Sequence, residues 1–324
     1  MEKINKLKNI LKDEKIDGYI IPKNDEFFGE YIPENKDRLK YISEFSGSYG
    51  FSLILKNKNY LFVDGRYTLQ AKNQSRKFFK IKTIPSELPR DVLKKKGLKI
   101  GYDPKLFTKK SLNNFFEKNN CDLVSLNTNF VDKIWKRSEN KTNNKFYILP
   151  NSSVGENYKS KINKIVLELK KKNIDFKFIT ASENNAWLLN IRGNDSTYTP
   201  IPHSYILINK KGNLIFFCDL KKILPSFKEK FRTIKFIDIS STDKILSKIN
   251  KKKFIIDKNT CSIYFENIIL ENNKILDHQD SIYLLKAIKK KKEIENIKKA
   301  HIYDGVALTK YLFWLKKNFN KKKI

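Results

Sequence analysis

One order of expected elements occurs twice along this chain, and the repetition constrains the fold more than any other feature. An amphipathic helix, a short apolar strand, a helix and a two-stranded hairpin follow one another, and the same order returns about 155 residues later. Asp64 follows the first hairpin and Asp219 follows the second. Hairpins require antiparallel pairing and helical crossovers suit parallel pairing, so we expect a duplicated α/β domain with mixed β-sheets flanked by helices.

Apolar spacing and turn residues give the expected element ranges. The first copy comprises a helix over 2–14, strands over 18–21, 51–55, 60–63 and 122–126, and a helix over 109–117 capped by Thr108. The second comprises helices over 158–172, 182–190 (capped by Ser182) and 243–249, with strands over 176–179, 205–208, 214–218, 234–239 and 254–256. Residues 136–156 are polar and contain Pro150, so we expect domains over 1–138 and 139–285.

Helical character dominates the C-terminal residues 284–315. Apolar side chains fall near one stripe that includes His301, and Gly305 interrupts the run, so either one kinked helix or two helices are expected. An apolar face this wide requires a packing surface. His301, on that stripe, is expected to be a packing histidine and not a ligand.

The net charge of +32 favours a solvated lysine surface over a nucleic-acid interface. Sixty of the 67 basic residues are lysine, and the lysine runs are scattered along the whole chain. A dedicated nucleic-acid-binding protein usually concentrates its charge and uses arginine for bidentate phosphate contacts. We therefore expect no specific nucleic-acid partner, and a non-specific nucleic-acid binder stays as the weaker alternative.

Other compositional signals indicate a cytoplasmic protein. No apolar run approaches the roughly 20 residues that cross a bilayer, and the N-terminal residues lack an apolar signal core. Cys121, Cys218 and Cys261 are far apart and odd in number, which suits buried, reduced thiols. We expect no membrane partner.

Common catalytic and nucleotide-binding motifs are absent from the sequence. It contains no GxxxxGK[ST], GxGxxG after a strand, HExxH or GxSxG, and its three histidines have no metal-like spacing. No residue is therefore assigned as catalytic or as a metal ligand.

Two arginines stand out against the lysine background. Arg66 follows a strand in Asp64-Gly65-Arg66-Tyr67, where a retained arginine suggests bidentate bonding to a carboxylate or carbonyl, or equally a structural pair with Asp64 or another carboxylate. Arg192 precedes Gly193, which is expected to end the preceding helix, so a structural cap and corner is favoured there.

These segments together resemble the aminopeptidase P family, the Xaa-Pro aminopeptidases of the creatinase–prolidase superfamily. The matching segments are Tyr19-Ile20-Ile21-Pro22, Phe45-Ser46-Gly47-Ser48, Asp64-Gly65-Arg66-Tyr67, Val131-Asp132-Lys133-Ile134-Trp135, Asn190-Ile191-Arg192-Gly193 and Asp304-Gly305-Val306-Ala307-Leu308. They occur in collinear order over essentially the whole chain.

The resemblance implies two creatinase-like N-terminal domains followed by the start of a pita-bread catalytic domain. Residues 286–324 would be the first helical segment of that domain, which is truncated here. In the family two divalent metals, usually manganese, activate the water that cleaves the bond before proline, and their ligands would lie beyond this segment. The resemblance therefore implies that this chain holds no cofactor and is inactive alone.

The resemblance carries one functional residue to this sequence. The family's arginine in the Asp-Gly-Arg-Tyr motif contacts substrate at the rim of the catalytic cleft, and here it is Arg66, with Asp64 and Tyr67 as its supports. The implied partner is a peptide with proline at its second position, and the full-length family often forms homodimers. The alternative is a stand-alone peptide-binding or interaction module, with the C-terminal apolar stripe as its interface.

Overall fold

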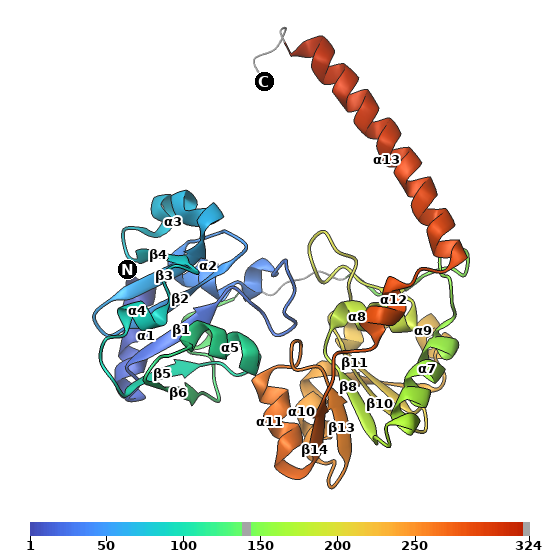
Figure 1. The fold of residues 1–324 in the computed structure, drawn as a ribbon, viewed down its shortest axis with the longest axis horizontal. Coiled ribbons are helices and arrows are strands. Elements are labelled where there is room, and N and C mark those ends of the chain that lie inside the picture. The colour runs from blue at the N-terminus through green and yellow to red at the C-terminus, as the bar shows by residue number, and fades with distance from the viewer. Residues whose placement is uncertain (138–143, 320–324) are drawn as a thin grey trace.

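The computed structural model describes residues 1–137 and 144–319, which form two α/β domains and a C-terminal helix (Figure 1). Each domain contains one six-stranded sheet. The expected boundary at residues 138 and 139 lies outside the described residues. We call the part that carries β1–β6 the first domain and the part that carries β8–β14 the second domain.

The first domain places the hairpin in the middle of a mixed sheet. Its strands, in the order β4-β3-β2-β1-β5-β6, are β1 (Gly18–Pro22), β2 (Gly50–Leu55), β3 (Asn59–Asp64), β4 (Lys80–Ile84), β5 (Leu98–Tyr102) and β6 (Cys121–Ser125). Its helices are α1 (Glu2–Asp13), α2 (Arg38–Ser43), α3 (Thr68–Ser75), α4 (Pro89–Val92), α5 (Lys109–Phe116) and α6 (Phe130–Ile134). β2 pairs antiparallel with β1 and β3, whereas the other pairings are parallel. The mixed sheet expected from the sequence is therefore confirmed.

Helices cover both faces of this sheet. Alternate residues of the central strands enter two separate cores: Tyr19 and Ile21 of β1 pack with α1 and α2 on one face, and Ile20 packs with α5 on the other. All five residues of β1 are buried as a result. A continuous apolar run such as this one is typical of a strand buried on both faces.

The second domain repeats the topology of the first. Its strands, in the order β12-β11-β10-β8-β13-β14, are β8 (Phe176–Ile179), β10 (Tyr205–Asn209), β11 (Leu214–Cys218), β12 (Ile234–Asp238), β13 (Lys253–Ile256) and β14 (Lys274–Asp277). Its helices are α7 (Tyr158–Lys171), α8 (Ser182–Leu189), α9 (Pro225–Lys230), α10 (Thr242–Ser247), α11 (Ile263–Asn272) and α12 (Ile282–Ala287). A short antiparallel pair, β7 (Tyr147–Ile148) with β9 (Ile191–Arg192), lies beside them. Strand order and pairing directions correspond one to one with the first domain, which supports the predicted duplication.

Local capping matches the sequence in one place and differs in another. The Thr108 side chain accepts a hydrogen bond from the backbone N–H of Ser111, so Thr108 caps α5 as predicted. Ser182 is not a cap, because it is the first residue of α8 and Ala181 holds the N-cap position. The Ser182 hydroxyl donates to the carbonyl oxygen of Ser204 instead, a partner that only the folded chain supplies.

The two domains are joined by backbone and side-chain contacts. The loop before α5 receives the first N–H groups of α11: Ile263 donates to the carbonyl of Phe107 at 2.8 Å and Tyr264 to that of Pro104 at 3.1 Å. These bonds satisfy helix-terminal donors that have no partner within α11. Lys109 of the first domain also pairs at 3.0 Å with Glu266, whose side chain is 1 % exposed. The seam is therefore a specific docking of the two domains.

The C-terminal helix α13 (Lys291–Asn318) runs away from both domains (Figure 1). It is one helix that continues through Gly305, so the expected alternative of two helices divided at that residue is wrong, and the break falls between α12 and α13 instead. The His301 side chain is exposed, which contradicts its predicted packing role, because no residue of α13 is buried against the rest of the described chain. No helix among the described residues is long and apolar enough to cross a membrane.

Candidate functional site

The Asp-Gly-Arg-Tyr segment lies where β3 ends and a short 3-10 turn, η2 (Gly65–Tyr67), begins. The Asp64 carboxylate accepts the backbone N–H of Arg66 at 2.9 Å and thereby caps the turn. The same carboxylate binds the Arg66 guanidinium, with Nη2 at 2.6 Å and Nε at 3.0 and 3.1 Å. One aspartate thus fixes both the backbone and the side chain of Arg66.

The guanidinium of Arg66 remains accessible despite this pair. Its side chain is 74 % exposed, and its Nη1 makes no hydrogen bond with a described residue. The hydrogen bond from Arg66 lowers the pKa of Asp64 below its ordinary value, and the same bond raises the pKa of Arg66. Both groups therefore stay charged. The ion pair of Arg66 with Asp64, one of the two interpretations of the sequence, is present, and the Nη1 side of the guanidinium still has no partner among the described residues.

Tyr67 supports this arrangement from the other side. Its hydroxyl is 2.7 Å from the hydroxyl of Ser48, and its ring lies under the Arg66 guanidinium, whose carbon is 5.4 Å from the ring centre. The ring also packs edge-on against the buried Phe45. Asp64 and Tyr67 thus both contact the Arg66 side chain.

A surface hollow of about 430 Å³ opens beside Arg66. Residues from four parts of the first domain line it, namely Pro22, Lys23, Asn24, Gly29, Glu30, Ser48, Tyr49, Gly50, Arg66, Phe107, Ser111, Asn114 and Phe115. Of this set, the sequence singled out only Arg66 for a functional role. The proximity of the others to Arg66 depends on the loop after β1, the loop before β2 and the segment after β5, so no local pattern marks them.

The second domain carries the same turn without the arginine. Asp219 follows β11 and caps the turn η3 (Leu220–Lys222) by accepting the backbone N–H of Lys221 at 2.9 Å. Lys221 thus stands where Arg66 stands in the first domain. The correspondence of Asp64 with Asp219 is confirmed, and the guanidinium belongs to the first copy alone.

The second arginine segment is structural. Arg192 Nη1 donates to the carbonyl oxygens of Ile191 at 2.8 Å and Ala186 at 3.2 Å. Helix α8 ends at Leu189 and its C-cap, Asn190, adopts a left-handed conformation with φ 56°, so the predicted helix end at Gly193 is wrong. Asparagine tolerates this conformation better than most residues. Gly193 has a different role, because a Cβ there would lie 2.8 Å from the ring of Phe146.

A buried ionic cluster holds the segment that leads from β1 to α2. Arg38, whose side chain is 4 % exposed, donates to Asp132 at 2.8 and 2.9 Å and to Glu26 at 2.6 Å. Burial opposes the ionisation of Glu26, but Lys36 and Arg38 outweigh it and hold its pKa well below the usual range. This cluster fixes the loop that contacts the second domain.

The three cysteines of the chain are free thiols. Cys218 and Cys261 are buried and Cys121 is half-buried, and all three are free, as predicted. Burial raises the pKa of Cys218 and Cys261, so both are protonated thiols. Among residues 1–137 and 144–319, no three His, Cys, Asp or Glu side chains come together in a group that fits a metal ion.

Both parts of the chain match family models described as the creatinase/prolidase N-terminal domain, one over residues 3–133 and the other over 136–293. The chain therefore belongs to the creatinase/prolidase family. It is 29% identical to Xaa-Pro aminopeptidase 1 of Dictyostelium discoideum over 99% of this chain and 54% of that protein. It is 30% identical to the Xaa-Pro aminopeptidase ApepP of Drosophila melanogaster over 94% of this chain and 52% of that protein.

A solved relative shares the arrangement of the whole chain. The X-prolyl aminopeptidase of Caenorhabditis elegans, described as a cytosolic enzyme with a dinuclear active site, matches with a TM-score of 0.88 and 25% identity. The match covers 99% of this chain and 57% of that enzyme. The chain thus spans about half the length of the relatives it matches.

Proposed function

We propose that this chain forms the non-catalytic N-terminal part of a metal-dependent Xaa-Pro aminopeptidase, which removes the first residue of peptides with proline second. The observation that carries the proposal is the match to the C. elegans enzyme, which extends over 99% of this chain at a TM-score of 0.88. A match of this extent includes both domains and their docking.

In this proposal the enzyme uses two divalent metal ions, expected to be manganese, and both are bound outside the described residues. The described residues bring no suitable group of metal ligands together. The chain by itself is therefore expected to be inactive. A cytoplasmic location, in keeping with the cytosolic C. elegans enzyme, and homodimerisation of the full-length protein are part of the same proposal.

Arg66 is proposed to contact the peptide substrate. Three observations support this role: the guanidinium is exposed, Asp64 and the Tyr67 ring hold its orientation, and a hollow of about 430 Å³ adjoins it. A guanidinium whose direction is already fixed loses little entropy when it binds a carbonyl or carboxylate. Asp64 and Tyr67 act through Arg66 and are positioning residues.

Helix α13 is proposed to be the first helical segment of the catalytic domain. No residue of this helix is buried, and large apolar side chains such as Leu308, Leu312, Phe313 and Trp314 are all at least 45 % exposed. A helix that exposes this much apolar surface requires a packing partner.

Two assays test the function. In the first, the chain alone is incubated with manganese and an Arg-Pro-Pro peptide, and we expect no release of arginine. Substantial manganese-dependent release would refute the claim of inactivity. In the second, the chain is fused to the part of the C. elegans enzyme that lies beyond its matched region, and we expect release to appear.

Variants of the fused protein test Arg66. The Arg66→Gln variant is expected to lower kcat/KM about tenfold, the effect of losing one charge-assisted hydrogen bond. Arg76→Gln is the matched control, because Arg76 is also exposed and lies outside the hollow. Equal activity of the two variants would contradict the proposed role of Arg66.

The exposed apolar surface of α13 also favours a second candidate, a stand-alone peptide-binding or interaction module. Such a module would pair through α13 with a separate chain. A purified chain that is monomeric, does not aggregate and has no partner in a pull-down would exclude it.

A further inference from the structure

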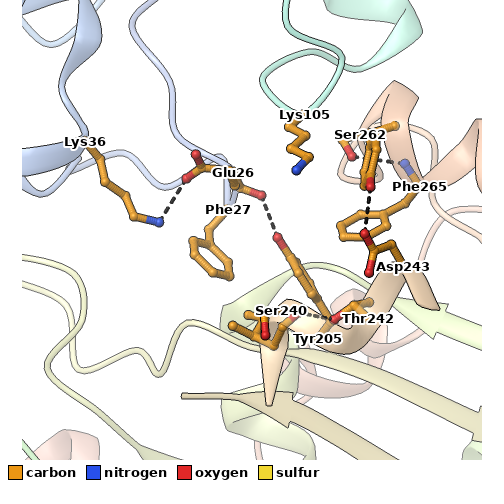
Figure 2. Close-up of a pocket in the computed structure, with 12 residues that line it drawn as sticks. Glu26, Phe27, Lys36, Lys105, Tyr205, Ser240, Thr242, Asp243, Ser262 and Phe265 are labelled. Atoms are coloured by element: carbon orange, nitrogen blue, oxygen red, sulfur yellow. Dashed lines mark hydrogen bonds and ion pairs between the residues drawn. The ribbon is translucent and has the colours of Figure 1, made fainter. Parts of the chain in front are cut away.

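A cavity of about 200 Å³ lies between the two domains (Figure 2). The first domain contributes Phe27 and Lys105 to its lining, and the second contributes Tyr205, Asp243 and Phe265. None of its lining residues belongs to the hollow beside Arg66. Small-molecule sites in proteins often lie at such domain interfaces.

Aromatic rings form the apolar walls of this cavity. The ring centre of Tyr205 lies 5.3 Å from that of Phe27 and 5.1 Å from that of Phe265, and Phe265 is 5.3 Å from Tyr264. The Tyr205 hydroxyl is already used, because it donates to the carbonyl oxygen of Glu26 at 2.9 Å. These rings therefore offer a surface suited to an apolar group.

One cation and one anion flank the Tyr264 ring. The ammonium group of Lys105 lies over the ring, 4.5 Å from its centre, and makes no hydrogen bond or ion pair with a described residue. The Asp243 carboxylate accepts the Tyr264 hydroxyl at 2.9 Å and the backbone N–H of Lys244 at 2.7 Å, and it has no cationic partner among the described residues. Lys105 and Asp243 do not pair with each other, so each can form an ion pair with an oppositely charged group of a ligand.

The other charged groups of the cavity are already satisfied. Glu26 pairs with Lys36 at 2.9 Å and with Arg38 at 2.6 Å. Lys105 and Asp243 are therefore the two charges left for a ligand, and they have opposite signs and come from opposite domains.

We propose that this cavity binds a free apolar α-amino acid as a zwitterion. Its carboxylate meets Lys105, its ammonium group meets Asp243, and its side chain lies among Phe27, Tyr205 and Phe265. The volume agrees with this class, because pockets for drug-sized ligands measure about 300–1,000 Å³ and this cavity is smaller. Occupancy would link the two domains through the ligand.

Isothermal titration calorimetry on the whole chain tests the proposal with three matched probes. L-phenylalanine carries both charges, 3-phenylpropionate lacks the ammonium group and 2-phenylethylamine lacks the carboxylate. We expect L-phenylalanine to bind at least about tenfold more tightly than either analogue, since each analogue loses one charge-assisted contact. Absence of phenylalanine binding, or equal binding of an analogue, would overturn the proposal.

Variants at the two charges locate the site. Lys105→Gln and Asp243→Asn are each expected to weaken phenylalanine binding about tenfold. The matched controls are Lys94→Gln and Asp122→Asn, because both residues are exposed and lie outside the cavity. If the site variants bind like the controls, the proposed site is wrong. Binding at this cavity requires no peptidase activity, so the titration tests the site whether or not the chain belongs to an active aminopeptidase.

Discussion

His203 lies in the seam between the two domains as a neutral ring, and its replacement tests that arrangement. The imidazole stacks on Phe27 of the first domain, with ring centres 4.1 Å apart and planes at 14°. Burial, together with the nearby Lys36 and Lys222, lowers the pKa of His203 to about 3 against the opposing effect of Glu26. The folded protein therefore holds this ring neutral at pH 5, where an unfolded chain would protonate it.

The sign and size of the effect follow from proton linkage. An unfolded histidine binds a proton below about pH 6.5 and the folded His203 does so only near pH 3, so stability is lost as the pH falls through this window. Between pH 7 and pH 5 the loss in the free energy of unfolding is about 2 kcal/mol. This figure depends mainly on the unfolded pKa, because pH 5 lies well above the folded pKa.

The assay is urea unfolding at pH 7, 6 and 5, followed by the fluorescence of Trp187. Substituting Trp135→Phe and Trp314→Phe in the background makes this signal report the second domain, which contains His203. The His203→Phe variant keeps an aromatic ring on Phe27 and removes the titrating group. We expect the wild-type free energy to fall by about 2 kcal/mol across this range and that of the variant to stay nearly constant.

A matched histidine provides the control. His278 is exposed, so the His278→Gln variant is expected to follow the wild-type pH dependence. The reasoning is refuted if His203→Phe loses stability with falling pH as steeply as the wild type does. That result would mean that His203 accepts a proton in the folded protein without cost.

Three further perturbations test other parts of the structure. Arg38→Met leaves Asp132 and Glu26 without their buried cation and is expected to cost about 3 kcal/mol in urea unfolding of the first domain, and an unchanged midpoint would contradict the buried cluster. Lys109→Met removes an ion pair between the two domains. The Ile263 amide, which donates to the Phe107 carbonyl of the first domain, should then exchange its hydrogen faster as measured by NMR. Unchanged protection of this amide would contradict a role of the ion pair in domain docking. Asp64→Ala removes a cap and should cost about 1 kcal/mol in thermal unfolding, whereas Asp64→Asn should cost less, and equal losses would exclude capping as the cause.

Strongly apolar and well-capped segments were predictable because their signals are local. The sequence predicted β8 and β11 with the bounds that the structure shows, and α7 within one residue of its end. The edge strands β4 and β14 were missed. β4 alternates lysine with apolar residues and β14 is largely exposed, so neither has the continuous apolar run that marks the buried strands.

The candidate site around Arg66 was likewise predictable only where its residues are close in sequence. Arg66, Asp64 and Tyr67 are close in sequence, and the sequence identified them together with the turn that presents them. The free Nη1 of Arg66 and the hollow beside it depend on loops from three places in the chain. No local pattern reveals which loop ends the fold brings to one surface.

The sequence by itself determined the duplicated α/β organisation and the retained arginine, because apolar periodicity, turn residues and residue choice act over a few neighbouring positions. Tertiary structure alone decided the contacts between the domains: Phe27 stacks on His203, and Lys105 faces the same cavity as Asp243. These partners are more than a hundred residues apart in the chain. Their proximity follows from how two similar domains dock, and docking depends on surface shape and charge that one-dimensional spacing does not encode.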